Sequence, residues 1–353
     1  MEKIRFAVAG SGWRARFYLR AAQQLPECFE LTGVLCHSAQ GARALAKETG
    51  VKTCTTLGAL LADSPAFVVS CVRKAAMPEM VTLLLKAGVP VLSETPLATD
   101  ISTLRSLDET QRRTGTALEL AEQYFLWPTH QARRTLIDRG LLGQVTSCAL
   151  SMMHDYHAVS MLRFYLGEEN GDVQIRARRV TSPIVKTGDR SGLIAGGPVE
   201  EENRVLAQLT YADGRLGLYD FAGTQYHSAI RSSHLRILGT RGEIFDDDVR
   251  WVDAQGRPQQ ERLQVERDRM SGTVRAVSFL GERLYENPFR ADVTMSEDEI
   301  AVCSVLERMG ETLRTGQPFY PLAHAFRDAY IACLMAGAAD EDGRIHTVAM
   351  DWD

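Results

Sequence analysis

A glycine pair between a short apolar run and a helical pattern constrains the fold of this chain more than any other feature. The apolar run covers residues 4–9 (IRFAVA), Gly10-Ser11-Gly12 follows it, and the helical pattern continues to about residue 24. Glycines at such a junction permit a tight turn and let another molecule approach the backbone, where a helix N-terminus attracts anions. The chain is therefore expected to begin with a strand, a glycine turn and a helix.

The alternation of strands and helices continues to residue 124. Further strand-like runs cover 29–37, 67–72, 89–95 and 117–124. The segments between them carry helical patterns, at 39–49, 76–87 and 100–114. Strands that alternate with helices of about ten to fifteen residues predict βαβ units and a parallel sheet. We therefore expect an α/β Rossmann domain over residues 1–124 that binds a dinucleotide.

The cofactor is expected to contact the glycine turn and the carboxyl ends of the strands, where ligands bind in doubly wound sheets. The turn and the helix start contribute Gly10, Ser11, Gly12, Trp13 and Arg14. The later strands contribute Val72, Arg73, Glu94, Pro96 and Glu122. Two plainer interpretations stay open: the glycines form a simple strand-to-helix turn, and Arg14 is a solvated surface charge rather than a phosphate ligand.

The end of the second strand bears on the choice between NAD and NADP. A carboxylate that binds the ribose 2′-hydroxyl is typical there, but this chain has Cys36, His37 and Ser38, with Arg43 nearby. The cation and the polar side chains could accommodate a 2′-phosphate, which favours NADP weakly. The alternative is a plain loop with no cofactor preference.

After about residue 124 the pattern predicts an α+β domain over 125–353 with a largely antiparallel open sheet. Helical patterns at 128–139 and 155–166 flank a strand-like run at 144–152. Period-two runs then follow, at 172–181, 203–212, 215–223, 233–239 and 243–252. Asp213-Gly214 predicts a hairpin, Asp246-Asp247-Asp248 a turn rather than a calcium loop, and 183–201 a long loop. Two helices end the chain: a capping box at Ser296 starts one that runs to about residue 314, and 322–338 is the other.

Length and charge exclude several classes of protein. At about 150 residues per domain, 353 residues suggest two domains. The net charge of −5 does not favour binding to nucleic acid or anionic lipid. No run approaches the roughly 18 apolar residues of a membrane-spanning helix. The seven cysteines are scattered without a CxxC pair, which is typical of reduced thiols, and we expect a cytoplasmic protein with no metal site.

Taken in order, several segments make the chain resemble the Gfo/Idh/MocA family of NAD(P)-dependent oxidoreductases. They are GSG, VLCHS, FVVSCV, AGVPVLSETPLA, RRTLIDRGLLGQV and HDYHAVSMLRFYLG. The resemblance covers nearly the whole chain. It implies a Rossmann domain, a C-terminal domain whose open sheet often mediates homo-oligomers, and a sugar, a sugar derivative or a cyclitol as substrate.

This chain departs from the family pattern at three positions. The family's Glu-Lys-Pro is Glu94-Thr95-Pro96 here, so a hydroxyl stands where the family has a lysine. In its Asp-x-x-x-His motif the histidine matches His157, but the aspartate is Met153. A further family histidine matches Met77. Of the family's catalytic-type positions, this chain therefore keeps only the histidine, as His157.

His157 stands in a cluster of titratable residues, with His154, Asp155 and Tyr156 beside it. A neutral histidine is a natural general acid or base near pH 7. We expect His157 to exchange the proton of the substrate hydroxyl, and Tyr156 or His154 to replace the missing lysine. His157 and one neighbour are expected to point into the nicotinamide cleft, near Glu94 and Thr95. The alternative is that Asp155 caps the helix between two structural histidines.

The predicted activity is hydride transfer between NAD(P) and a sugar, a cyclitol or a related hydroxy or keto compound. An NAD-dependent glycosidase is the alternative within the family. A catalytically silent sensor or scaffold that binds NAD(P) is the alternative from another class, favoured by Thr95 and Met153. The expected partners are a sugar-like small molecule and further copies of the chain, bound through the C-terminal sheet.

Overall fold

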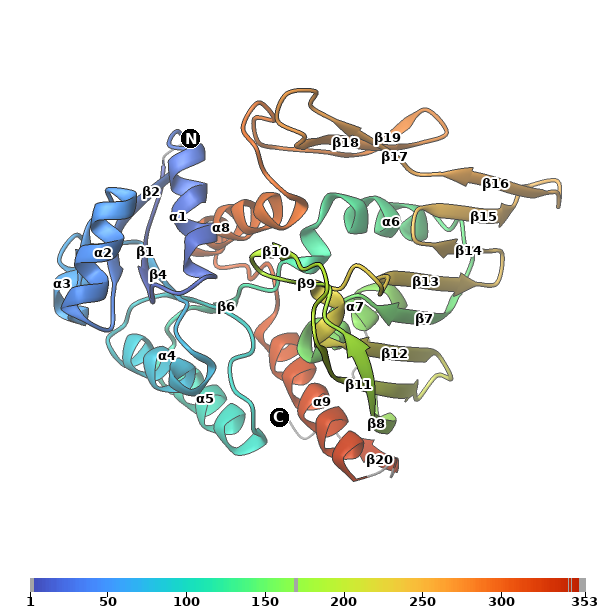
Figure 1. The fold of residues 1–353 in the computed structure, drawn as a ribbon, viewed down its shortest axis with the longest axis horizontal. Coiled ribbons are helices and arrows are strands. Elements are labelled where there is room, and N and C mark those ends of the chain that lie inside the picture. Colours follow the sequence, from blue (N-terminus) through green and yellow to red (C-terminus); the bar gives the residue numbers. More distant parts are fainter. Residues whose placement is uncertain (1–2, 168–170, 342, 344, 349–353) are drawn as a thin grey trace. The chain divides into compact units, whose positions relative to one another are not determined.

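A six-stranded parallel sheet forms the centre of the first part of the computed structural model (Figure 1), which describes residues 3–167, 171–341, 343 and 345–348. The strands follow the order β3-β2-β1-β4-β5-β6, and every neighbouring pair is parallel. They are β1 (Ile4–Ala9), β2 (Phe29–Leu35), β3 (Thr53–Cys54), β4 (Phe67–Ser70), β5 (Val91–Ser93) and β6 (Leu118–Leu120). This is the order of a doubly wound dinucleotide-binding sheet, so the predicted Rossmann fold is confirmed.

Helices cover both faces of this sheet. They are α1 (Ala15–Gln24), α2 (Ala39–Thr49), α3 (Leu57–Leu61), α4 (Met77–Lys86), α5 (Ile101–Thr114) and α8 (Glu297–Thr315). Figure 1 shows α4 and α5 packed together on one side, and α1 packs against α8 on the other. All four residues of β4 are buried, as expected for a strand covered on both faces. The predicted capping box starts α8, where the Ser296 and Glu299 side chains each accept a hydrogen bond from the other's backbone N–H.

The chain divides into two units, which are described separately. The first unit comprises Met1–Trp127, Asp268–Thr273 and Pro288–Tyr330. The second unit comprises Pro128–Arg267, Val274–Asn287 and Ile331–Asp353. Helix α8 therefore belongs to the unit that holds the parallel sheet.

A nine-stranded sheet forms the centre of the second unit, in the order β16-β15-β14-β13-β7-β12-β11-β8-β20. Only the β7–β12 pair is parallel, which confirms the predicted antiparallel character. The strands are β7 (Val145–Ser151), β8 (Val173–Val185), β11 (Val199–Tyr211), β12 (Leu216–Ala222), β13 (His234–Gly239), β14 (Gly242–Phe245), β15 (Asp248–Val252), β16 (Pro258–Arg262) and β20 (Ile345–Val348). As predicted, Asp213-Gly214 lies in the turn of the β11–β12 hairpin, and Asp246 turns the chain between β14 and β15.

Two helices and a small sheet complete the second unit. Helix α7 (Asp155–Leu166) packs on β7 and β12, and α6 (Pro128–Asp138) packs on the small sheet. That sheet has the order β17-β18-β19, with β17 (Gln264–Arg267), β18 (Val274–Phe279) and β19 (Glu282–Glu286). The last helix, α9, covers Leu322–Asp340. Among the described residues, no helix is long and apolar enough to cross a membrane.

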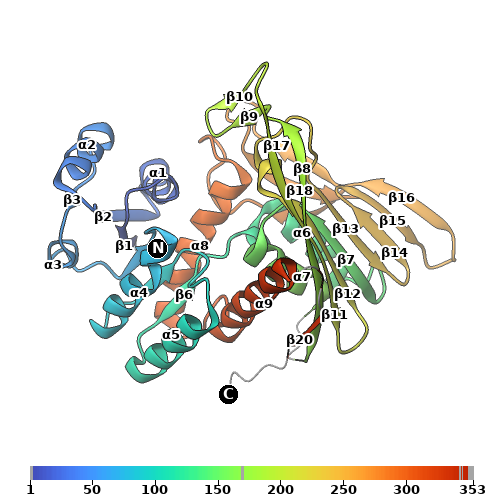
Figure 2. The same cartoon turned by 60° about the horizontal axis from the view of Figure 1, so that its bottom comes forward.

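The predicted loop over 183–201 is wrong. Strands β8 and β11 stay paired up to Val185 and Val199, and two short strands, β9 (Gly188–Asp189) and β10 (Gly192–Leu193), form the end of the hairpin (Figure 2). The period-two pattern fails here because most side chains of 182–201 are exposed or half-buried. Backbone pairing maintains the strands without an alternation of apolar residues.

Candidate functional site

The glycine turn after β1 uses its two glycines for different reasons. Gly10 has a φ of +120°, and a Cβ atom there would lie 2.3 Å from the carbonyl oxygen of Cys71. A Cβ atom on Gly12 would meet no atom within 4 Å. The fold therefore requires glycine at position 10, whereas at position 12 glycine leaves open space beside the backbone. Such space at the start of a helix suits the pyrophosphate of a dinucleotide.

The start of α1 carries a network of charged side chains. The Nε of Arg14 donates to Glu94 at 2.7 Å, and its Nη1 donates to Asp298 at 2.7 Å. The Tyr18 hydroxyl also donates to Glu94, at 2.5 Å. Burial lowers the pKa of Arg14, but Glu94 and Asp298 more than offset this and hold that pKa above its usual value. Arg14 is thus not the solvated surface charge of the plainer interpretation.

The network leaves two buried polar atoms without hydrogen-bond partners among the described residues. They are the Nη2 of Arg14 and the Oε1 of Gln123. The Nε2 of Gln123 donates to Asp298 at 3.0 Å, so both residues converge on one carboxylate. Buried polar atoms without partners are rare in proteins and are typical of sites that await a ligand or water. These atoms, with the space at Gly12, fit a polar cofactor at the carboxyl ends of these strands.

Sequence reasoning missed three members of this network: Tyr18, Gln123 and Asp298. Gln123 directly follows Glu122 at the end of β6, and that position could have indicated it. Asp298 lies 284 residues from Arg14 along the chain, and no sequence pattern joins the two. Glu122 itself is fully buried and accepts a hydrogen bond from the Tyr124 N–H at 3.1 Å.

The remaining predicted cofactor residues lie at the ends of β2 and β4. Cys36 is buried, and its N–H donates to the Cys54 carbonyl at 2.8 Å. Ser38 caps α2 by accepting from the Gly41 N–H at 3.1 Å, whereas His37 and Arg73 are exposed. The preference for NADP, inferred from these residues and Arg43, stays a prediction.

The histidine cluster lies at the start of α7 in the second unit. The rings of His154 and His157 are 5.0 Å apart, and those of Tyr156 and His157 are 5.8 Å apart. His157 and Tyr156 are buried, whereas His154 is half-buried. The structure therefore brings all three predicted residues together. Thr95, the fourth predicted catalytic residue, belongs to the first unit, where its N–H donates to the Glu94 carboxylate at 3.3 Å.

Two tyrosines from other elements hold this cluster, and the sequence did not indicate them. The Tyr226 hydroxyl, in the 3₁₀ turn η3 (Gly223–Tyr226), lies 2.7 Å from Nδ1 of His154 and accepts from the His154 N–H. The Tyr219 hydroxyl, on β12, accepts from the Asp155 N–H at 3.1 Å. Burial, and secondarily the Asp155 charge, raises the pKa of Tyr219 above its usual value. Tyr219 therefore remains a neutral hydroxyl.

Asp155 does not cap α7. The residue at the cap is His154, without a side-chain hydrogen bond to the helix, and Asp155 has a φ of +37°. A side chain other than glycine at positive φ is strained, and such strain clusters at functional sites. Met153, at the family's aspartate position, is fully buried. No group of three potential metal ligands occurs among the described residues.

Comparison with known proteins identifies a sequence family for most of the first unit's parallel sheet. Residues 4–121 match a family described as an oxidoreductase family with an NAD-binding Rossmann fold, which confirms the resemblance for this part of the chain. No curated protein matches the chain by sequence.

Solved structures of similar fold extend over nearly the whole chain. A myo-inositol dehydrogenase from Corynebacterium glutamicum is 16% identical, with a TM-score of 0.65 over 99% of this chain and 100% of that one. An oxidoreductase from Agrobacterium radiobacter, solved with NAD+, L-tartaric acid and magnesium, is 14% identical, with a TM-score of 0.71 over 98% of each chain. The WlbA dehydrogenase from Bordetella pertussis, solved with NADH and UDP-GlcNAcA, is 16% identical, with a TM-score of 0.66 over 99% of each chain. At these identities the similarity shows the fold.

Proposed function

We propose that this protein transfers hydride between NAD(P) and a sugar, a cyclitol or a related compound, since residues 4–121 match the Gfo/Idh/MocA family model of NAD-binding oxidoreductases. The observation that supports this proposal most is the open space at Gly12, beside a Gly10 that the fold itself requires. The nicotinamide supplies the hydride chemistry when bound, and the protein supplies binding, orientation and a path for the proton.

The second unit is proposed to supply the proton path. His157 takes the proton of the substrate hydroxyl during oxidation and returns it during reduction. Tyr226 holds His154 through a 2.7 Å hydrogen bond, and His154 in turn packs against His157. His154 and His157, with Tyr156, replace the cation that the family's lysine supplies, because Thr95 offers only a neutral hydroxyl. Neutral donors are roughly half as strong as charged ones, so more than one is needed.

The substrate class follows from the family and from the similar folds, one of which is a myo-inositol dehydrogenase. Assaying NAD+ and NADP+ with a panel of hexoses, cyclitols and sugar acids, followed by nicotinamide absorbance, tests this activity. Turnover with at least one polyol or keto sugar is expected. Saturable cofactor binding without turnover on any member would overturn the proposal in favour of the silent sensor. Release of a glycosidic leaving group without net NADH formation would favour the glycosidase.

We further propose a preference for NADP(H), since no carboxylate at Cys36 repels a 2′-phosphate. Calorimetric titrations with NADPH and NADH compare the two. Tighter binding of NADPH is expected, and equal or tighter binding of NADH would contradict it.

A homo-oligomer formed through the nine-stranded sheet is also proposed. Val180, Leu206 and Leu218 are exposed on three adjacent strands, and their pairing register places them on one face. Apolar side chains gathered on one face are typical of protein interfaces. Light scattering after gel filtration should give a mass of at least twice 39.1 kDa. A monomer at micromolar concentration would contradict this assembly.

A further inference from the structure

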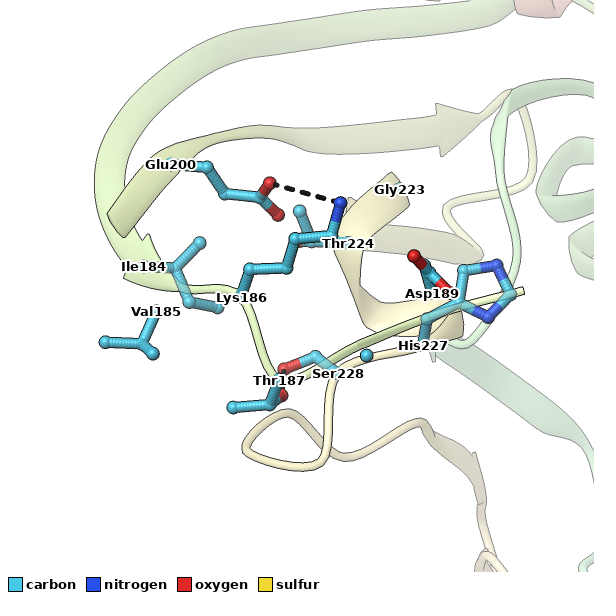
Figure 3. A pocket seen from close by; sticks show the side chains of 11 residues that line it. Ile184, Val185, Lys186, Thr187, Asp189, Glu200, Gly223, Thr224, His227 and Ser228 are labelled. Atoms are coloured by element: carbon cyan, nitrogen blue, oxygen red, sulfur yellow. Dashed lines mark hydrogen bonds and ion pairs between the residues drawn. The ribbon is translucent and has the colours of Figure 1, made fainter. Parts of the chain in front are cut away.

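The end of the β8–β11 hairpin forms a pocket with the η3 turn, within the second unit (Figure 3). One wall runs from Ile184 to Asp189, and the opposite wall consists of Gly223, Thr224, His227 and Ser228. Glu200, on β11, closes one side. The pocket volume is about 280 Å³. This is close to the lower limit of roughly 300–1,000 Å³ for small-molecule sites, so a single ring suits it better than a nucleotide.

Direct contacts fix the two walls against each other. The N–H of Ala229 donates to the Thr187 hydroxyl at 2.9 Å. Gly188 approaches the other wall so closely that a Cβ atom on it would lie 2.3 Å from the carbonyl oxygen of His227. The antiparallel pairing of Glu200 with Ile184 then sets the position of Glu200 on the neighbouring strand. The pocket is therefore a built part of the fold.

The charged groups of the pocket keep unused hydrogen-bonding capacity. The Nζ of Lys186 is 4.0 Å from a Glu200 oxygen, which is an ion pair but too far for a hydrogen bond (Figure 3). Oδ1 of Asp189 accepts from the Ser191 N–H at 2.7 Å, which leaves the other carboxylate oxygen available. The lysine and the two carboxylates together give a formal charge of −1. This charge disfavours phosphate and carboxylate ligands and favours a cationic one.

We propose that this pocket binds a single sugar or cyclitol ring that carries an ammonium group. Glu200 and Asp189 accept hydrogen bonds from the ammonium group and from ring hydroxyls, and Lys186 donates to a ring hydroxyl. Ile184, which pairs with Glu200 and lies on the same face of the hairpin, provides an apolar surface for the C–H groups of the ring. A metal ion is not the occupant, since the described residues contain no group of three potential ligands.

The pocket shares an element with the histidine cluster. Thr224 lines the pocket, and Tyr226, two residues later in the same turn, holds His154. A bound ring therefore rests against the turn that positions the proposed proton path. Binding itself requires neither cofactor nor turnover, so it can be measured independently of the proposed oxidoreductase activity.

Glucosamine, glucose and glucuronate are matched probes, since they share a ring and differ in charge. Each is titrated by calorimetry into the full chain without cofactor. We expect saturable binding of glucosamine, and binding roughly tenfold weaker for glucose and weaker still for glucuronate, because a charged hydrogen bond contributes more than a neutral one.

Glu200→Gln tests the pocket directly, and Glu201→Gln is its control, since the next residue on β11 is exposed and outside the pocket lining. Glucosamine should bind roughly 10- to 100-fold more weakly to Glu200→Gln. Its affinity for Glu201→Gln should stay within about twofold of wild type. Asp189→Asn is a second variant in case Glu200→Gln unfolds. Thermal unfolding verifies that each variant is folded.

Three outcomes would overturn the proposal. The first is that glucosamine shows no saturable binding, and the second is that glucuronate binds as tightly as glucosamine. The third is that folded Glu200→Gln and wild type bind glucosamine with equal affinity. Failure of the protein to bind NAD(P)H would contradict the oxidoreductase proposal alone, because these titrations contain no cofactor.

Discussion

The glycine turn of the first unit and the histidine cluster of the second are built in different ways. The turn relies on backbone geometry within three residues, where Gly10 fills a position that no side chain could occupy and Gly12 leaves space. The cluster relies on side chains from separate elements, since Tyr226 reaches His154 from 72 residues away. We propose that the first construction binds the cofactor and that the second belongs to the proton path.

This difference explains which motifs of the resembled family the sequence keeps and which it replaces. A turn that leaves space beside its backbone depends on glycines, and few substitutions preserve that space. A proton path can be rebuilt from other donors, so Thr95 and Met153 can replace a lysine and an aspartate if the histidine cluster compensates. Substitutions in the glycine turn should therefore lower stability and cofactor affinity. Substitutions in the histidine cluster should lower turnover and leave cofactor affinity unchanged.

The largest expected effect is that of His157→Ala. Loss of a positioned acid or base should lower kcat by about 10²–10⁴-fold, while NADH affinity stays unchanged. Steady-state kinetics and NADH titration measure both. His234→Ala, a histidine on β13 of the same unit, is the control and should retain full turnover. Undiminished kcat in His157→Ala would reject the proposed proton path.

Gly10→Ala should destabilise the protein by roughly 2–6 kcal/mol, since it combines strain at positive φ with a clash against the Cys71 carbonyl. Urea unfolding measures the free energy of unfolding. Gly12→Ala is the matched control and should change that energy by less than about 0.5 kcal/mol, because its Cβ meets open space. Equal free energies of unfolding for the two variants would contradict the claim that the fold requires glycine at position 10 but not at position 12.

Glu119 should make stability depend on pH through the first unit. Burial raises the pKa of this carboxyl, on β6, to about 8. In the unfolded chain the carboxyl ionises near its usual pKa of about 4.3, so the folded protein loses stability as pH rises from about 4.3 to about 8. Glu119→Gln should remove this loss and gain on the order of 5 kcal/mol at pH 8, with little gain at pH 4. Parallel pH profiles of unfolding for variant and wild type would contradict this.

Tyr226→Phe should have the smallest effect. It removes the hydroxyl that holds His154, a hydrogen bond that contributes about 0.5–1.5 kcal/mol, so kcat should fall by about two- to tenfold. The pH profile of kcat should also shift, because the partner of His154 changes. NADH affinity should stay constant. An unchanged kcat with an unchanged pH profile would show that Tyr226 has no positioning role.

Much of the fold could be predicted because its signals are local. The βαβ rhythm located β1, β2, β4, β5 and β6 but missed the two-residue β3, and α7 covers the predicted residues 155–166. The hairpin end at 183–201 escaped prediction because its exposed side chains carry no apolar period. The pairs Arg14–Asp298 and His154–Tyr226 also escaped, since periodicity does not show which distant segments meet. The capping box and the helical pattern located α8, but they could not show that this helix belongs to the same unit as the parallel sheet.

Titration of NADH into wild type and Gly12→Val tests most directly whether the turn at Gly12 binds a nicotinamide dinucleotide. Trp13, at the same turn, provides a fluorescence signal beside the site. Wild type should bind saturably, and folded Gly12→Val at least about tenfold more weakly, because valine fills the space where the backbone meets the pyrophosphate. Equal affinity in a folded Gly12→Val protein would contradict binding at this turn.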